Sequence, residues 1–131
     1  MSFSDDMRRF ARKTDDSSDR IVRAVTLSLF NGIVRDTPVD TGRARGNWQT
    51  DVGAPAESEI DRIDKAGSAA MAEIQAKTPE GAGQVTFLAN NLPYVILLEN
   101  GSSQKAPEGM VRRNMLRIAS NLKKAVRSNK V

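Results

Sequence analysis

The segment "TPVDTGRARGNW", residues 37–48, separates a helical pattern from a pattern of strands. Pro38 predicts the end of a helix at the residue before it, because a residue that precedes proline disfavours the α region. Asp40, Thr41 and Gly42 predict a turn, since short polar side chains bond the local backbone and glycine can adopt a positive φ. This turn therefore predicts where the first helix ends and the sheet begins.

Upstream of the turn, residues 4–36 predict a long helix with Ser4 as its N-cap. Its apolar side chains recur at a spacing of four, at Ile21, Val25, Leu29 and Ile33. The polar residues 14–18 interrupt this stripe, so the segment is either one helix or a pair, with Asp16 or Ser18 capping the second. One helix would be about 45–50 Å long at roughly 1.5 Å per residue, so one end should project or meet a neighbour.

Downstream of the turn, the predicted elements are a strand at residues 43–52, a helix at 56–77, strands at 84–89 and 94–99, a loop at 100–109 and a helix at 110–128. Asn90-Asn91 is expected to turn the chain into a hairpin. The unbroken run "YVILL" predicts a strand covered on both faces. The expected apolar stripe of the last helix is Val111, Met115, Ile118, Leu122 and Val126.

This order of elements predicts an α+β domain. We expect a small, largely antiparallel sheet packed against a long N-terminal helix, a middle helix and a basic C-terminal helix. The length of 131 residues suits a single domain, 1–131, with the N-terminal helix or helix pair at 1–36, the sheet with its inserted helix at 37–109, and the basic helix at 110–131.

The composition argues against an enzyme. The chain has no cysteine and no histidine, which excludes thiolate and histidine metal sites and a Ser-His-Asp triad. Carboxylates stand near the ends of elements, where caps and turns commonly use acids, at Asp36, Asp40, Asp51, Glu99 and Glu108. The glycines form no phosphate-binding motif. We therefore expect no catalytic residue, no cofactor and no metal site.

No apolar run approaches the roughly 18 residues of a membrane span, and the first residues lack the apolar region of a signal peptide. A soluble protein without a membrane partner is expected.

The charge is uneven. Residues 109–131 carry seven basic and no acidic side chains, whereas the other 108 residues carry 13 basic and 16 acidic ones, a net −3. Such a basic helix predicts contact with nucleic acid or with an acidic protein surface. Because aromatic residues are not interleaved with the basic ones, a solvated helix face or an acidic protein partner is favoured over nucleic acid.

Two segments, "TPVDTGRARGNWQ" and "NNLPYVILLENGSSQKAPEGMVR", resemble the neck or tail-completion proteins of long-tailed bacteriophages. The matching positions in the first are Thr37, Pro38, Val39, Asp40, Thr41, Gly42, Arg45 and Trp48. In the second they are Asn91, Pro93, Tyr94, Glu99, Gly101, Ala106, Pro107, Gly109 and Met110. The chain departs from the family at Asn100, where an aromatic residue is common.

The resemblance implies a virion structural protein without enzymatic activity, assembled in the host cytoplasm. It would form a homo-oligomeric ring, a hexamer, at the head–tail junction. The implied partners are a head-closure or connector protein, a tail terminator or tail tube protein, and DNA passing through. The alternatives are a tail terminator ring proper and a nucleic-acid-binding module. We expect contacts with subunits or partners at Tyr94, Glu99, Gln104, Pro107, Met110, Arg112, Arg113 and Arg117.

Overall fold

The computed structural model describes residues 15–80 and 83–128 of the chain. Its elements are α2 (Asp15–Asp36), α3 (Arg43–Gly46), β1 (Gln49–Val52), α4 (Ser68–Lys77), β2 (Thr86–Ala89), α5 (Val95–Glu99) and α6 (Val111–Ser128). The expected helix at residues 4–14 and its cap at Ser4 lie outside the described residues. Asp16 and Ser18 lie inside α2, so the prediction that one of them caps a second helix is wrong.

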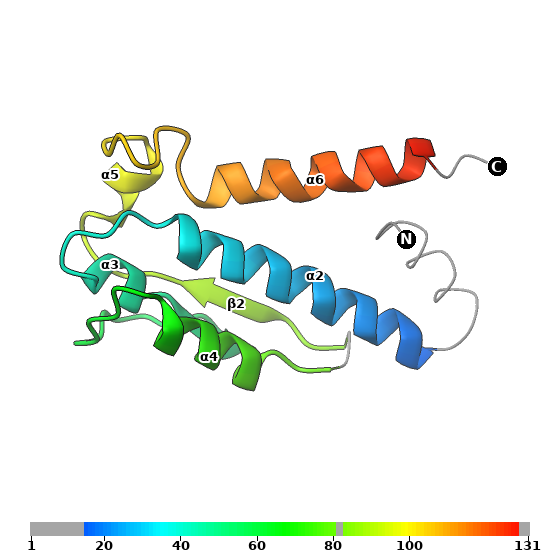
Figure 1. The fold of residues 1–131 in the computed structure, drawn as a ribbon. Coiled ribbons are helices and arrows are strands. Elements are labelled where there is room, and N and C mark those ends of the chain that lie inside the picture. Colours follow the sequence, from blue (N-terminus) through cyan, green and yellow to red (C-terminus); the bar gives the residue numbers. More distant parts are fainter. Residues whose placement is uncertain (1–14, 81–82, 129–131) are drawn as a thin grey trace.

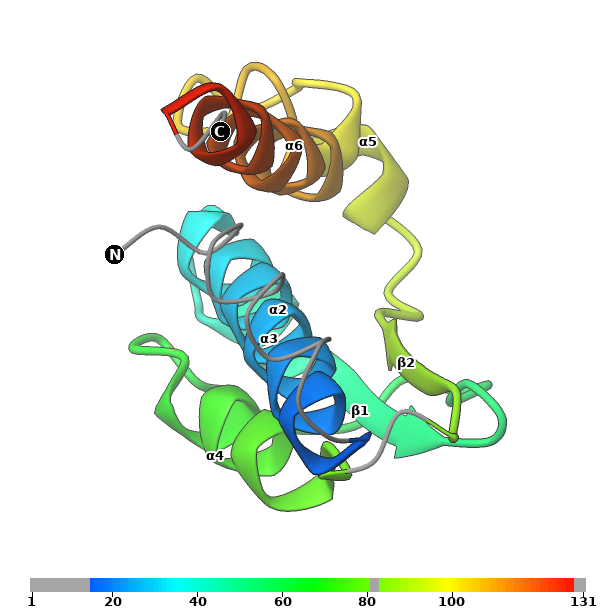
Figure 2. The same ribbon diagram turned by 90° about the vertical axis from the view of Figure 1, so that its right-hand side faces the viewer.

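Helix α2 forms the middle of the molecule. Figure 1 shows α6 running along one side of α2, and α4 with the strands on the other side. In the end-on view of Figure 2, α2 again lies between these two groups. The described residues form one two-stranded antiparallel sheet, in which Gln49 lies opposite Ala89 and Val52 opposite Thr86. The predicted α+β class is confirmed.

The hydrophobic core lies between α2, the sheet and α4, and it extends to the start of α6. Its buried members are Phe30, Ile33, Val34, Trp48, Ala70, Ile74, Ala106 and Met110. The predicted ladder of α2 therefore does face the core, with Ile21 and Ile33 buried and Val25 and Leu29 half-buried.

The strand predicted at residues 43–52 is present only in its last four residues. Residues 43–46 form the short helix α3, in which the N–H of Gly46 donates to the carbonyl of Gly42 at 3.0 Å. The extended backbone begins at Gln49. The correction has a local cause, because the turn at Gly42 leads directly into a helical turn.

The helix predicted at residues 56–77 is correct only for its second half. Residues 53–67 form an irregular excursion, and α4 begins after Gly67, which has a φ of +78°. Arg62 holds the excursion by donating to the carbonyls of Gly46 and Trp48, at 2.7 Å each, and to the Glu73 carboxylate at 2.9 Å. These long-range bonds outweigh the weak helical pattern of residues 56–67.

The strand predicted at residues 94–99 is wrong, because the chain forms the short helix α5 there. Ile96 and Leu97 are 68% and 60% exposed, so burial on both faces is also wrong. The predicted hairpin is absent, since β2 pairs with β1 instead of with the segment that follows it. Asn90 and Asn91 hold the chain through side-chain bonds to the carbonyls of Ala44 and Ala56, at 2.8 and 2.9 Å.

Helix α6 faces α2 with a more polar side than predicted. Met110, just before its first turn, and Asn114 are buried, whereas Met115 in the expected stripe is exposed. The side chains of Leu122 and Val126 lie outside the description. None of the helices within residues 15–80 and 83–128 is long and apolar enough to cross a membrane.

Candidate interaction site

The turn segment, residues 37–48, forms a buried, hydrogen-bonded cluster at the C-terminal end of α2. The Thr37 hydroxyl donates to the carbonyl of Ile33 at 2.7 Å and accepts the indole N–H of Trp48 at 2.8 Å. Both Thr37 and Trp48 are buried. The Trp48 side chain therefore has its polar atom satisfied inside the core, which is what a buried indole needs.

Arg45 caps the same C-terminal end of α2. Its guanidinium donates to the carbonyls of Arg35 and Thr37 and, across the turn, to that of Lys65 at 2.8 Å. The last carbonyls of a helix lack partners within the helix and carry partial negative charge, so a cation is well placed there. Within the described residues, all of these acceptors are backbone carbonyls.

The predicted turn at residues 40–42 is present. Gly42 has a φ of +93°, and a Cβ there would lie 2.7 Å from the backbone nitrogen of Lys65. Thr41 accepts the N–H of Arg43 on its hydroxyl at 3.2 Å, the local bond expected of a turn residue. Asp40 and Thr41 are exposed and Pro38 is half-buried.

Glu99, at the end of α5, caps the start of α6. One carboxylate oxygen accepts the N–H groups of Met110 and Val111 at 2.9 Å each, and the other accepts that of Arg112 at 3.0 Å. Burial raises the pKa of Glu99, but these backbone N–H groups outweigh it and hold the pKa below its usual value. Gly109 allows the approach, since a Cβ there would lie 2.4 Å from the Glu99 carbonyl.

A polar cluster around Asp36 fastens α6 to α2. The Asp36 carboxylate accepts from the buried Asn114 amide at 2.9 Å and pairs with Arg117 at 3.2 Å and Arg113 at 3.9 Å. The helices approach closely there, because a Cβ on Gly32 would lie 2.1 Å from the Asn114 side-chain oxygen. The position of α6 is therefore set at two points, by Glu99 and by Asp36.

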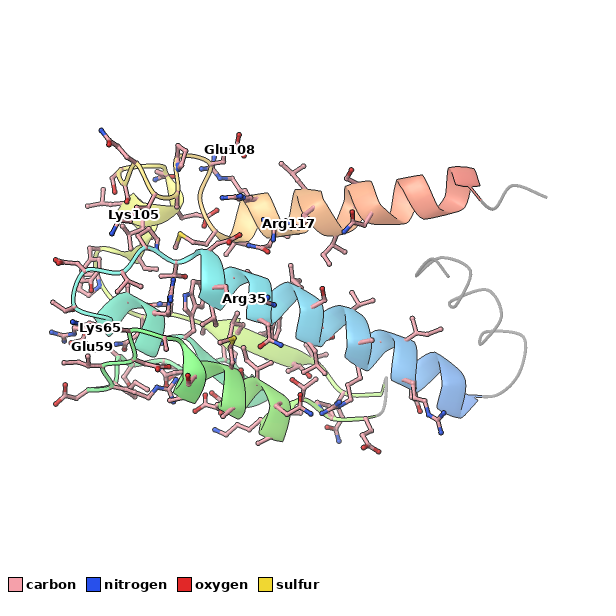
Figure 3. The ribbon with its side chains drawn as sticks, viewed as in Figure 1. Arg35, Glu59, Lys65, Lys105, Glu108 and Arg117 are labelled. Atoms are coloured by element: carbon pink, nitrogen blue, oxygen red, sulfur yellow. The ribbon has the colours of Figure 1, made fainter. Side chains whose placement is uncertain are left out.

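The two segments that carry the family resemblance, one beginning at Thr37 and the other at Asn90, meet at an open groove of about 610 Å³. One wall consists of residues 38–44, and the other is made by Tyr94, Leu98, Ser103 and Lys105. The Lys105 ammonium donates to the carbonyl of Val39 at 3.1 Å and so joins the walls. Figure 3 shows Lys105 beside the end of α2, between the loop that follows α5 and the turn.

Helix α5, which contributes Leu98 to the groove, and helix α6 carry large apolar side chains that are exposed to water. Ile96 and Leu97 are exposed on α5, and Met115 and Leu116 are 57% and 68% exposed on α6. Tyr94, just before α5, is exposed as well. Single exposed apolar residues need no explanation, but a group of them within one anchored segment is typical of a surface that contacts another protein.

The expected contact residues fall into three groups. Tyr94, Gln104 and Pro107 are exposed, as a contact surface requires. Arg112, Arg113 and Arg117 are also exposed, and each pairs with Glu99 or Asp36. Glu99 is an internal cap and Met110 is fully buried, so these two act inside the subunit.

Several residues of this site were not anticipated. Asp36 and Asn114 stand far apart in the sequence, and no local pattern signals their contact. Ile96 and Leu97 could have been found by testing "YVILL" for a helical period, which places Val95 and Leu98 on one side and the other two residues opposite.

In the part of the chain that the structure describes, no group of three or more acidic side chains is arranged to hold a metal ion. Comparisons of the chain with protein-family models, with curated proteins and with solved structures found no match.

Proposed function

We propose that this protein is a virion structural protein that forms a homo-oligomeric ring at the head–tail junction of a long-tailed bacteriophage. In that role it would complete the tail and join it to the DNA-filled head. The proposal draws on the paired sequence segments that resemble neck and tail-completion proteins. It also draws on a site made for contact, where these two segments line a common groove.

One observation carries the proposal. The α5–α6 segment is held rigidly by Glu99 and Asp36, yet it keeps large apolar side chains exposed. Because the backbone of such a helix is already ordered, a partner that covers these side chains costs only their rotamer freedom, which makes contact there less costly than contact with a flexible loop. A protein that positions its neighbours needs such a preformed surface and no reacting group.

The function is tested by inactivating the gene in the phage that carries it and imaging the lysate by negative stain. The expected result is separate filled heads and tails. Filled heads joined to normal tails would reject the proposal. Gold-labelled protein then distinguishes the two rings: label on detached heads supports a neck ring, and label on detached tails supports a tail terminator.

The surface is tested by complementation with the double variant Ile96→Asp/Leu97→Asp. Both side chains are exposed, so the fold should persist while joining of heads to tails fails. The matched control is Val22→Asp/Val85→Asp, which changes exposed apolar residues outside α5 and α6. Equal loss of joining in both variants would remove the argument for this surface.

A nucleic-acid-binding module is the second candidate, because residues 109–131 carry seven basic side chains and no acid. The described arginines of α6 pair with Glu99 and Asp36, which weakens this candidate. It requires binding to a short duplex that falls steeply with salt, since bound phosphates release counterions. No binding at low salt would eliminate it.

A further inference from the structure

We propose that neighbouring copies in the ring make a head-to-tail contact between two different surfaces of the chain. One is the basic face, defined as the exposed side of α6 with Met115, Leu116 and the three arginines at 112, 113 and 117. The other is the acidic excursion, defined as residues 53–64 of the irregular segment 53–67 and therefore without Lys65. This inference rests on the proposed ring and adds which surfaces close it.

The acidic excursion combines negative charge with an exposed apolar residue. Glu57, Glu59 and Asp61 are exposed, and Ile63 beside them is 66% exposed. Residues 53–64 contain four acids and one base, a net −3. Within the subunit, Arg62 pairs with Glu73 and Arg43 forms an exposed pair with Glu59 at 3.6 Å, so Glu57 and Asp61 are the exposed acids that a partner's cations would meet first.

The excursion is preformed, although it lacks regular structure. The side-chain amide of Gln49 donates to the carbonyl of Ser58 at 2.8 Å. The backbone N–H of Ile60 donates to the side-chain oxygen of Asn47, also at 2.8 Å. Asn91 donates to the carbonyl of Ala56 at 2.9 Å. A partner would therefore meet a surface that is already ordered, which lowers the entropic cost of binding.

The basic face has the complementary chemistry. Met115 and Leu116 are exposed apolar side chains, and the three arginines beside them share only two carboxylates, Glu99 and Asp36. The segment 109–131 as a whole carries +7. The two surfaces thus carry exposed apolar side chains together with an excess of charge, positive on α6 and negative on the excursion, and opposite charges favour contact between them.

The two surfaces lie on opposite sides of the molecule. In Figure 3, Arg117 and Glu108 lie on the α6 side, whereas Glu59 and Lys65 lie on the far side of α2, near the start of α4. They cannot meet within one copy, so each copy presents both to its neighbours. A contact between two different patches repeats from copy to copy, and it closes into a ring when the rotation allows.

The experiment uses the full chain and two variants, each with one damaged surface. The excursion variant is Asp61→Lys/Ile63→Lys, and the helix variant is Met115→Asp/Leu116→Asp. Native mass spectrometry at low salt follows the oligomers. Each variant alone should need at least about tenfold more protein than the wild type to assemble, the shift that about 1.4 kcal/mol gives. Far-UV circular dichroism confirms the fold of each variant.

Mixing the variants gives the sharper result. The excursion variant keeps its basic face, and the helix variant keeps its acidic excursion. These two intact surfaces can pair once, so the mixture should form a one-to-one dimer and nothing larger. The control variant Val22→Asp/Glu80→Lys changes an exposed apolar and an exposed acidic residue elsewhere and should assemble like the wild type.

Three outcomes overturn the inference: wild-type oligomers that persist in either variant, a mixture without the dimer, and a wild-type chain that stays monomeric at low salt and at its highest attainable concentration. These outcomes concern only the contact. The proposed function fails separately, when phage lacking the gene still joins filled heads to tails.

Discussion

Arg45 and Glu99 use opposite charges for the same purpose at opposite kinds of helix end. Arg45 donates to the carbonyls of Arg35 and Thr37 at the end of α2, and Glu99 accepts N–H groups at the start of α6. In both places the helix leaves backbone groups without partners, and one side chain satisfies several of them.

The surroundings of these two residues differ. Arg45 lies next to the buried pair of Thr37 and Trp48, so its bonds help to close the core. Glu99 holds a helix whose Met115 and Leu116 remain in water. The comparison teaches that the same kind of helix cap can have two purposes. Arg45 stabilises the core around residues 37–48, whereas Glu99 fixes the position of an exposed surface on α6. The predictions below test this division.

The largest effect is expected from Gly42→Val in the first segment. The substitution places a branched side chain at a φ of +93° and against the Lys65 backbone, so we expect a loss of about 3 kcal/mol or more. Urea denaturation measures it. Gly53→Val is the control, because Gly53 has a φ of +89° but nothing within 4 Å of its Cβ position. Equal losses would mean that the contact with Lys65 contributes nothing.

Arg45→Met should cost about 2 kcal/mol, because it leaves the last carbonyls of α2 and that of Lys65 without their charged donor. The control is Arg43→Met on the same short helix, whose exposed pair with Glu59 is worth about 1 kcal/mol or less. Denaturant titrations of both variants give the difference. If Arg43→Met were the more destabilised, Arg45 would not be the residue that closes α2.

Thr37→Val keeps the side-chain shape but removes the hydroxyl that accepts the Trp48 N–H. The buried indole N–H then lacks a partner, and we expect a loss of about 1.5 kcal/mol. Thermal unfolding compares it with Thr26→Val, which removes a hydroxyl that donates to the Val22 carbonyl near the surface. A stable Thr37→Val protein would show that the hydrogen bond is dispensable.

The smallest effect is expected from Glu99→Gln, about 1 kcal/mol, and it should depend on pH. The folded-state pKa of Glu99 lies below the unfolded value, so its contribution is fully present above the unfolded pKa. It is lost as the pH falls through the folded pKa, in the acidic range below about 4.3. The protection factors of the amides at the first turn of α6, which compare the measured exchange rate with the intrinsic rate at the same pH, should therefore fall in acid for the wild type.

Glu73 provides the control for that experiment. Burial raises the pKa of Glu73, but bonds from Thr50 and Arg62 outweigh it and lower the pKa, so it loses its contribution in the same acidic range. Glu73→Gln should leave the acid response of α6 unchanged, whereas Glu99→Gln should abolish it. An acid response of α6 that survives in Glu99→Gln would contradict the capping role.

The fold could be predicted from the sequence where one local rule acted alone. The proline at position 38 marks the end of α2, Gly42 marks a turn that requires positive φ, and the strand predicted at residues 84–89 contains β2. The order of the predicted elements indicated the α+β class, and the charge pattern indicated a basic C-terminal helix. The exposed arginines at 112, 113 and 117 were also anticipated, since long charged side chains favour water.

Tertiary structure decided the rest, because short segments without strong local preference take the conformation that their distant contacts favour. Arg62 draws residues 53–67 out of a helix, and Asn90 ties the chain to Ala44 and prevents a hairpin. The carboxylate of Glu99 reaches the start of α6 from a short helix that was expected to be a strand. Asp36 fixes the other contact of α6 with α2. The sequence alone thus determined the turn at residues 38–42 and the charge pattern, and long-range bonds decided which apolar side chains remain exposed.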